Sequence, residues 1–404
     1  MRRVVVTGMG VVSSLGETAA KHCAGLSEGR NGIRDLDITD IDRLSVKIGG
    51  QAASYAGEAL FSRSELALYD RCTQMAITAS QEAVEASGLE LGDEERLRAA
   101  TVIGTALTGM GTVDDAYRTV FQDGKNRVHP FVVPRLMASA PCSHISMKHG
   151  LMGPAFSVTT ACSSANHAMG QAFQMVRSGM ADVALTGGAE APLVFGVMKA
   201  WEGLRVMSRD ACRPFAADRN GMVQGEGAAV YVLETLERAQ ARGADILAEI
   251  VGFGMSADAA DIVQPSADGA GRAMLGALTD AQMGAWEVGY INAHGTGTAA
   301  NDKTECQAVR TVFGTHAEEL MISSTKSMHG HCLGGAGAVE MAAVIHALKN
   351  GVISPTINHG ETDPDCALDV VPNAAREVPV KAALSNSFAF GGLNAVLALR
   401  AFEG

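Results

Sequence analysis

The chain has 404 residues, more than one hydrophobic core usually organises, so we expect two core units. Its formal net charge of −12 argues against nucleic-acid binding, which needs a basic surface. Eight cysteines are scattered without a CxxC pair, which argues against a disulfide scaffold and indicates a reducing compartment.

The first apolar run, at 4–6, is interrupted at once by Thr7 and Gly8, which favours a buried strand over a signal peptide. No apolar stretch reaches the roughly 18 residues that a membrane helix needs. We therefore expect a cytoplasmic protein without a membrane span.

Short β-branched runs alternate with alanine-rich helical patterns, which predicts α/β layers. In the first half, strands are predicted at 3–7, 100–104, 154–158, 182–186 and 228–233, and helices at 17–27, 66–87, 135–149, 163–178 and 234–242. In the second half, strands are predicted at 247–252, 288–292, 320–324, 382–386 and 394–400, and helices at 270–281, 302–312 and 335–349.

A faint internal repeat runs through these elements. Residues 225–233 resemble 391–399, because both are glycine turns that lead into a strand, and residues 3–10 resemble 248–254. Duplication predicts two α/β domains, 1–246 and 247–404, with functional loops at their shared seam, where clefts form. Coincidence between glycine-rich strands is the alternative.

Cys162 lies where the strand 154–158 ends and the helix 163–178 begins. Backbone N–H groups at a helix N-terminus carry partial positive charge and favour a thiolate. This position therefore favours a reactive cysteine, whereas the ordinary alternative is a buried and inert thiol.

Two histidine motifs follow predicted strands of the second half. His294 lies in the sequence NAHGTGT after 288–292, and His331 lies in SSTKSMHGH after 320–324. Ligands of α/β proteins gather at such strand ends. A cysteine with two histidines suits a metal or nucleophilic catalysis, but zinc ligands usually include closely spaced pairs, here only His329 and His331. We therefore expect no metal, with Cys162 as nucleophile and imidazoles that stabilise developing oxyanion charge.

Four motifs together carry a family resemblance. TACSS at 160–164, NAHGTGT at 292–298, STKSM with the following GH at 324–331, and NSFAFGG at 386–392 resemble the β-ketoacyl-acyl-carrier-protein synthases of the I/II type. The resemblance runs in order over essentially the whole chain, and the stretches 191–215 and 328–333 are most similar to the nodulation-protein-E-like branch. It implies a thiolase-like αβαβα fold of five layers from two duplicated halves, normally a homodimer, with a heterodimer as the alternative.

The resemblance also implies an acyltransferase that performs a decarboxylating Claisen condensation in fatty acid or specialised acyl and polyketide chain elongation. Cys162 would take the acyl group from acyl carrier protein, and malonyl-carrier protein would then lose CO2 while His294 and His331 donate hydrogen bonds to its thioester oxygen. The product would be 3-oxoacyl-carrier protein. Substrates ride on the carrier's phosphopantetheine, so no separate cofactor is implied.

Further roles are implied by position in these motifs. Lys326 and Glu305 match the pair that orders the histidines, and the backbone N–H groups of Cys162 and Phe390 match the oxyanion hole. Thr296 and Thr298 match positions that bind the pantetheine arm, although turn stabilisation by their hydroxyls is the alternative. Leu107, Met222 and Phe390 match the acyl pocket, with Phe390 as its gate.

The chain departs from the family pattern near the gate. Ala389 stands where glycine is usual and Leu393 where threonine is usual, which predicts a gate whose motion is stiffer or differently set. Met222 replaces a common phenylalanine and would reshape the pocket. His329 replaces threonine, and we interpret it as structural.

Acidic carrier proteins dock on basic residues. The candidates are Arg63, Arg71, Lys125, Arg127 and Arg209, although the segment 62–72 has fewer basic residues than is usual in the family.

Three other classes compete with this interpretation. A chain-length-factor-type partner subunit would lack the nucleophilic cysteine, a thiolase would have a second cysteine near the C-terminus, and a synthase III would have asparagine in place of one histidine. Cys162 argues against the first, Phe388 and Phe390 in place of a C-terminal cysteine argue against the second, and the presence of both His294 and His331 argues against the third.

Overall fold

The computed structural model describes residues 1–403, and ten strands form its central sheet. The first half supplies β1 (Val4–Val12), β4 (Ala99–Gly104), β5 (Ala155–Val158), β6 (Val183–Glu190) and β7 (Gly227–Thr235). The second half supplies β8 (Ala248–Ala257), β9 (Tyr290–Asn292), β10 (Met321–Ser323), β13 (Ala382–Ala389) and β14 (Leu393–Arg400). Two small ribbons pair β2 (Arg34–Asp35) with β3 (Ile48–Gly49) and β11 (Val352–Ile353) with β12 (Arg376–Glu377). Each strand predicted from the sequence is present.

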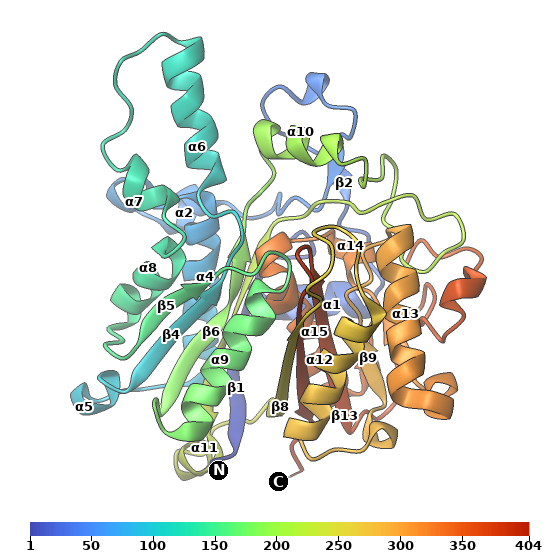
Figure 1. Cartoon of the computed structure of the whole chain (residues 1–404). Helices are drawn as coiled ribbons and strands as arrows, with labels where there is room; N and C mark the ends of the chain where they lie inside the picture. The colour runs from blue at the N-terminus through green and yellow to red at the C-terminus, as the bar shows by residue number, and fades with distance from the viewer. Residues whose placement is uncertain (404) are drawn as a thin grey trace.

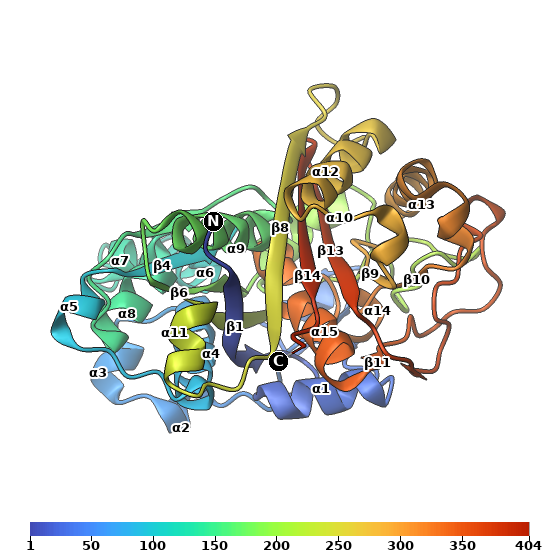
Figure 2. The same ribbon diagram turned by 90° about the horizontal axis from the view of Figure 1, so that it is seen from below.

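The two halves of the sheet repeat one strand order. From the centre outward the first half reads β1, β7, β6, β4, β5, and the second reads β8, β14, β13, β9, β10. They join where β1 pairs antiparallel with β8, and the two strands lie side by side in Figure 2. The repeats detected in the sequence thus coincide with the equivalent pairs β1/β8 and β7/β14, which supports duplication. The division at residues 246 and 247 stays a prediction, and it lies directly before β8.

Helices cover and separate the two halves (Figure 1). The helices α4 (Arg71–Ser87) and α8 (Ala140–His149) pack on the first half, while α12 (Ala267–Asp280) packs on the second and against α13 (Ala299–Phe313). Between the halves lie α9 (Ser164–Ser178) and α15 (Ala336–Asn350), which contact strands of both. The expected five-layered thiolase-like architecture is therefore confirmed.

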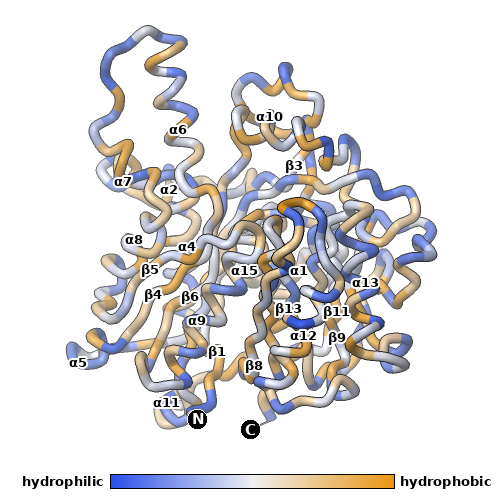
Figure 3. The backbone as a smooth tube through the Cα atoms, viewed as in Figure 1, coloured by the Kyte–Doolittle hydropathy of each residue, from blue (hydrophilic) through white to orange (hydrophobic). Residues whose placement is uncertain are grey.

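The central helix α15 shows why the layers form. Twelve of its fifteen residues are buried, since alanine, valine and other small apolar side chains occupy every face. A helix that is apolar all round must lie inside a protein. Figure 3 shows hydrophobic residues gathered on the sheet strands and hydrophilic ones in the outer loops.

Two helix predictions were wrong at their starts. The predicted helix 66–87 begins at Arg71, because the Asp70 side chain accepts a hydrogen bond from the N–H of Cys72 and caps α4. Residues 67–70 are not helical, and the separate helix α3 (Arg63–Leu66) lies before them. The predicted helix 135–149 divides likewise into α7 (Val132–Leu136) and α8.

The sequence did not predict α6 (Met110–Tyr117) or α10 (Phe195–Gly203), and α6 projects from the body in Figure 1. The helices predicted at 17–27 and 234–242 are present as α1 (Ala19–Ser27) and α11 (Leu236–Ala241). The short helices α2 (Gly57–Leu60), α5 (Asp93–Arg96) and α14 (Lys326–His329) were not predicted either. Within residues 1–403 we find no helix with the length and apolar character needed to cross a bilayer.

Candidate active site

Cys162 occupies a tight turn between β5 and α9, as predicted. Ala161 before it has a φ of 50°, in the left-handed region that side chains rarely adopt, so the turn that aims the thiol is strained. Burial raises the pKa of the Cys162 thiol to about 11, while the positive charge of Lys326 and backbone hydrogen bonds from Phe390 and Cys162 lower it. Burial thus outweighs the groups that favour a thiolate, and Cys162 rests as a thiol beside groups that stabilise its ionised form.

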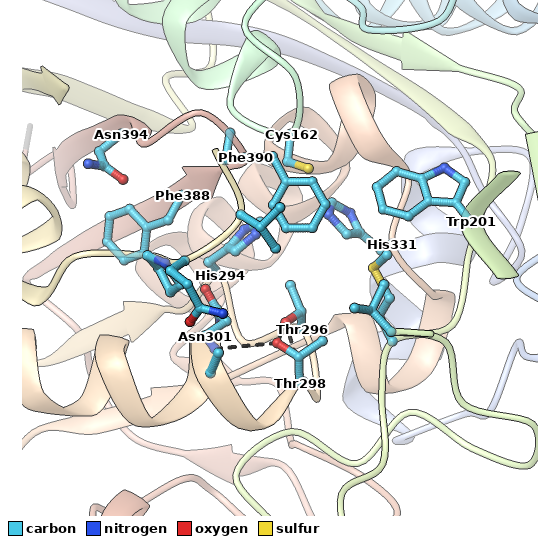
Figure 4. Close-up of a pocket in the computed structure, with 17 residues that line it drawn as sticks. Cys162, Trp201, His294, Thr296, Thr298, Asn301, His331, Phe388, Phe390 and Asn394 are labelled. Carbon is cyan, nitrogen blue, oxygen red and sulfur yellow. Dashed lines mark hydrogen bonds between the residues drawn. The ribbon is translucent and has the colours of Figure 1, made fainter. Parts of the chain in front are cut away.

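Two histidines meet this thiol from the other half of the fold (Figure 4). His294 follows β9, His331 follows α14, and the Cys162 sulfur and one nitrogen of each ring lie within 4.8 Å of one another. The two imidazole rings meet edge to face, with centroids 5.3 Å apart. The structure thus brings together three residues separated by up to 169 positions in the sequence.

The two imidazoles are neutral but differ in how they are held. Burial holds the pKa of each well below its usual range, and the nearby charge of Lys326 lowers it further. The backbone N–H of Leu333 donates to His331 Nδ1 at 3.2 Å, so the proton of His331 resides on Nε2, which has no other partner. No hydrogen bond within residues 1–403 engages either nitrogen of His294. His331 is therefore a fixed donor, whereas His294 is free to donate or accept.

The same three side chains form a donor set that a zinc ion could use. The positive charge of Lys326 acts on all three of them, however, and it opposes a cation at this point. The arrangement favours a nucleophile with two neutral hydrogen-bonding groups.

Lys326 and Glu305 both lie beside the histidines, but they do not pair with each other. Lys326 forms a wholly buried ion pair with Glu340 of α15, a residue that the sequence did not single out. Glu305 instead accepts hydrogen bonds from the backbone N–H groups of His294 at 2.9 Å and Gly295 at 2.8 Å. Glu305 thus orders the backbone that carries His294, and Lys326 supplies positive charge.

A cavity of about 140 Å³ opens in front of the thiol. Thr296 and Thr298 line it, with their hydroxyl oxygens 2.9 Å apart, and Thr298 also caps α13. Met222 and Phe390 line it too, as predicted for the acyl pocket. Leu107 does not, and its N–H is instead bound to Glu190.

Several lining residues escaped the sequence interpretation, namely Trp201, Val206, Val263, Gln264, Pro265, Ala300, Asn301, Phe388 and Asn394. The most prominent is Trp201 of α10, whose ring lies 5.8 Å from that of Phe390, tilted by 32°. The sequence could have drawn attention to Trp201, because it lies within the family-like stretch 191–215. Its contact with Phe390, however, depends on the tertiary structure.

The gate turn accommodates the departure at Ala389. This residue ends β13 and does not have a positive φ, whereas Gly391 and Gly392 take φ values of 82° and 67°. The left-handed backbone thus falls on residues that tolerate it, so alanine introduces no strain here. Leu393 begins β14 and does not line the cavity.

His329 lies outside the cavity. Its ring nitrogens contact the carbonyl oxygen of Gly330 at 2.8 Å and the Thr325 hydroxyl at 3.0 Å, and burial holds its pKa well below the usual range. These contacts agree with a structural role.

This buried neutral ring makes a prediction for stability. The unfolded chain takes up a proton on His329 near pH 6.5, whereas the folded chain does not. The contribution of His329 to the free energy of unfolding is therefore complete above that pH and is lost as the pH falls. We expect His329→Gln to reduce the loss of unfolding free energy between pH 7.5 and 5.5 by about 1 kcal/mol, measured by urea titration. His316→Gln, at a half-buried histidine near the surface, is the control. An unchanged pH slope in His329→Gln would contradict the assignment.

The candidate docking residues fall into two groups. Arg71 is bound to buried Glu226, and Lys125 is paired with Asp123. Arg63, Arg127 and Arg209 are exposed and form no ion pair within the part of the chain that the structure describes. These last three are therefore the candidates available to an acidic partner.

Comparison with known proteins gives matches along the chain. The sequence model described as "Beta-ketoacyl synthase, N-terminal domain" matches residues 1–239, and "Beta-ketoacyl synthase, C-terminal domain" matches residues 247–360. The chain is 47% identical to Nodulation protein E of Rhizobium sp. (strain N33), over 99% of both proteins. It is 40% identical to 3-oxoacyl-[acyl-carrier-protein] synthase 2 of Staphylococcus aureus (strain N315), over 100% of this chain and 99% of that protein.

The fold has equally complete matches among solved structures. One is a ketosynthase bound to a hexaketide in complex with its type II PKS acyl-carrier protein. It superposes with a TM-score of 0.90 at 30% sequence identity, and each chain is covered completely.

Proposed function

Since this chain belongs to the β-ketoacyl synthase family, we propose that it elongates acyl chains by decarboxylating condensation with malonyl-acyl carrier protein. The cluster of Cys162, His294 and His331 within 4.8 Å carries the proposal, because it unites a nucleophile with two neutral hydrogen-bonding groups. A chain-length-factor-type role is not favoured, since that role lacks the nucleophile.

The first step transfers the acyl group to Cys162. Its sulfur attacks the thioester carbonyl, and the backbone N–H groups of Cys162 and Phe390 stabilise the oxyanion. Because the thiol is protonated at rest, it must lose its proton as it attacks. His294 has nitrogens that no hydrogen bond fixes, so it takes this proton and returns it to the departing pantetheine thiolate.

The second step generates the carbon nucleophile. Malonyl thioester loses CO2, and the electron pair of the broken C–C bond moves onto the thioester oxygen as an enolate. The Nε2–H of His331 and an N–H of His294 donate to that oxygen. The enolate carbon then attacks the carbonyl carbon of acyl-Cys162, and the Cys162 sulfur leaves as a thiolate that takes up a proton from water. The 3-oxoacyl product remains on the carrier.

These separate roles predict how one variant divides the reaction. We expect His331→Ala to slow CO2 release from malonyl-carrier protein by about 100- to 1,000-fold, since one oxyanion donor is worth that much. Formation of acyl-Cys162, followed by mass spectrometry, should stay near the wild-type rate. His294→Ala should slow both steps.

His316→Ala, which changes a histidine outside the cavity, serves as the control. Decarboxylation at the wild-type rate by His331→Ala would exclude the proposed role of that imidazole.

An acidic acyl carrier protein is the proposed partner, and exposed Arg63, Arg127 and Arg209 support its docking. Thr296 and Thr298 lie in the cavity where a pantetheine arm would enter, and their hydroxyls can bind its amides. No cofactor beyond the carrier's phosphopantetheine is proposed.

A homodimer is the proposed assembly. The edge strand β5 leaves its outer side unpaired and exposes Phe156, and the projecting segment after α6 exposes Phe121 and Val133. Unpaired edges and apolar groups of this kind favour association with another chain. The proposed location is the cytoplasm, in agreement with eight free cysteines.

The size of the cavity limits the length of the acyl group that Cys162 can carry. At about 140 Å³ the cavity is smaller than the 300–1,000 Å³ typical of ligand sites, so a long chain requires Phe390 or its neighbour Trp201 to move. Mass spectrometry of the acyl group on Cys162 across a panel of acyl-carrier substrates identifies the chain.

A further inference from the structure

Four backbone segments touch one another beside the catalytic cluster. They are the loop after β4, the end of β6, the start of α9 and the turn Leu333–Gly335. A Cβ atom on Gly334 would lie 2.2 Å from the nitrogen of Ala106, and one on Gly104 would lie 2.4 Å from the nitrogen of Ala165. Only glycine permits these approaches, so the segments are locked together backbone to backbone.

The carboxylate of Glu190 lies inside this junction. It accepts hydrogen bonds from the N–H groups of Ala106 at 2.6 Å, Leu107 at 3.1 Å and Gly334 at 3.2 Å, and from the Thr105 hydroxyl at 3.2 Å. Glu190 is wholly buried and forms no ion pair within residues 1–403. The carboxylate therefore joins two loops that are more than 200 residues apart in the chain.

One of those loops also holds a catalytic imidazole. Successive N–H groups of the turn serve two acceptors: Leu333 donates to His331 Nδ1, and Gly334 donates to Glu190. A shift of this turn would move the Leu333 N–H away from Nδ1 and release the imidazole from the tautomer that carries Nε2–H.

We propose that Glu190 is a positioning residue that anchors the turn Leu333–Gly335 to the loop 105–107 and thereby keeps His331 as an Nε2–H donor. The proposal rests on the proposed function, since it assigns that donor to malonyl decarboxylation. Both oxygens of the Glu190 carboxylate accept hydrogen bonds from these donors. The side-chain amide of a glutamine at this position would instead point its NH2 group at the donors of one of the two loops.

The test variant is Glu190→Gln in the full-length protein. We expect CO2 release from malonyl-carrier protein to fall at least tenfold, with its KM unchanged, while acyl-Cys162 forms at a rate within about threefold of wild type. The matched control is Glu82→Gln, because Glu82 likewise accepts two backbone N–H groups, from Val11 and Ala19, and has no cationic partner. It should leave both rates within about twofold.

A spectroscopic measurement separates positioning from general support of the fold. The 15N shifts of labelled histidine should show His331 as the Nε2–H tautomer in the wild type and as a mixture of tautomers in Glu190→Gln, with His331→Asn used for assignment. Should Glu190→Gln not fold, Glu190→Asp keeps the charge but cannot reach both loops, and we expect the same changes.

A folded variant that keeps both the wild-type CO2 release and the single tautomer would overturn the proposal, as would an equal loss in both half-reactions. If the wild type itself releases no CO2 from malonyl-carrier protein, the proposed function fails. The tautomer measurement still decides the role of Glu190 in that case.

Discussion

Replacement of Cys162 by alanine is expected to abolish elongation of acyl-carrier protein with malonyl-carrier protein. The acyl group then has no sulfur on which to form a thioester, and no other cysteine lines the cavity. Mass spectrometry should find no acylated protein, and chromatography of the carrier should find no 3-oxoacyl product. CO2 release from malonyl-carrier protein should persist, because His294 and His331 are retained.

Cys142→Ala is the matched control, since this thiol is also buried but lies on α8, where it donates to the Thr101 carbonyl oxygen. It should leave elongation intact apart from a modest loss of stability. Undiminished elongation by Cys162→Ala would exclude the covalent mechanism altogether.

Replacement of Lys326 by methionine is expected to have the largest effect on stability. Lys326 and Glu340 are both wholly buried, so the change leaves a carboxylate inside the protein without its cation. Breaking a buried pair in this way costs about 3–5 kcal/mol, which urea unfolding of the variant would measure. Elongation should fall as well, because the charge of Lys326 lowers the pKa of Cys162.

A second substitution distinguishes these two effects. The double variant with Lys326→Met and Glu340→Gln removes both charges, and replacing a whole buried pair is often nearly neutral for stability. We expect it to recover most of the unfolding free energy but not the elongation rate. Recovery of both would mean that Lys326 serves the fold alone.

The buried ion pair of Lys326 and Glu340 explains how the buried catalytic cluster remains reactive. Burial raises the pKa of Cys162 and lowers those of His294 and His331, so all three groups are neutral at rest. A single positive charge nearby stabilises the negative charge that develops on sulfur and on the enolate oxygen. The same charge lowers the pKa of both imidazoles and so keeps them neutral, while Glu340 compensates it inside the protein.

Local patterns in the sequence were enough to predict most of the architecture. Runs such as 228–233 and 394–400 identified their strands because buried strands are short and β-branched, and their similarity to each other revealed the duplication. The failures came from competing local chemistry. Asp70 caps α4 and starts it at Arg71, an effect that apolar periodicity does not register.

The sequence by itself determined the reacting groups. Cys162 and His294 follow strands, and His331 follows the short helix α14 that comes after β10. Each lies in a motif of small residues, and strand ends are where such folds collect their functional side chains. It determined neither their protonation nor their supports. The resting state of Cys162 depends on burial, which local sequence does not encode.

The partners of Lys326 and Glu190, and the contact of Trp201 with Phe390, were decided only by the tertiary structure. Lys326 and Glu340 lie on two different helices, and Trp201 and Phe390 are distant in the chain. The glycine junction around Glu190 closes only when both halves pack together. Motifs record which groups react, whereas the packing of the two halves decides the charge, tautomer and reach of each group.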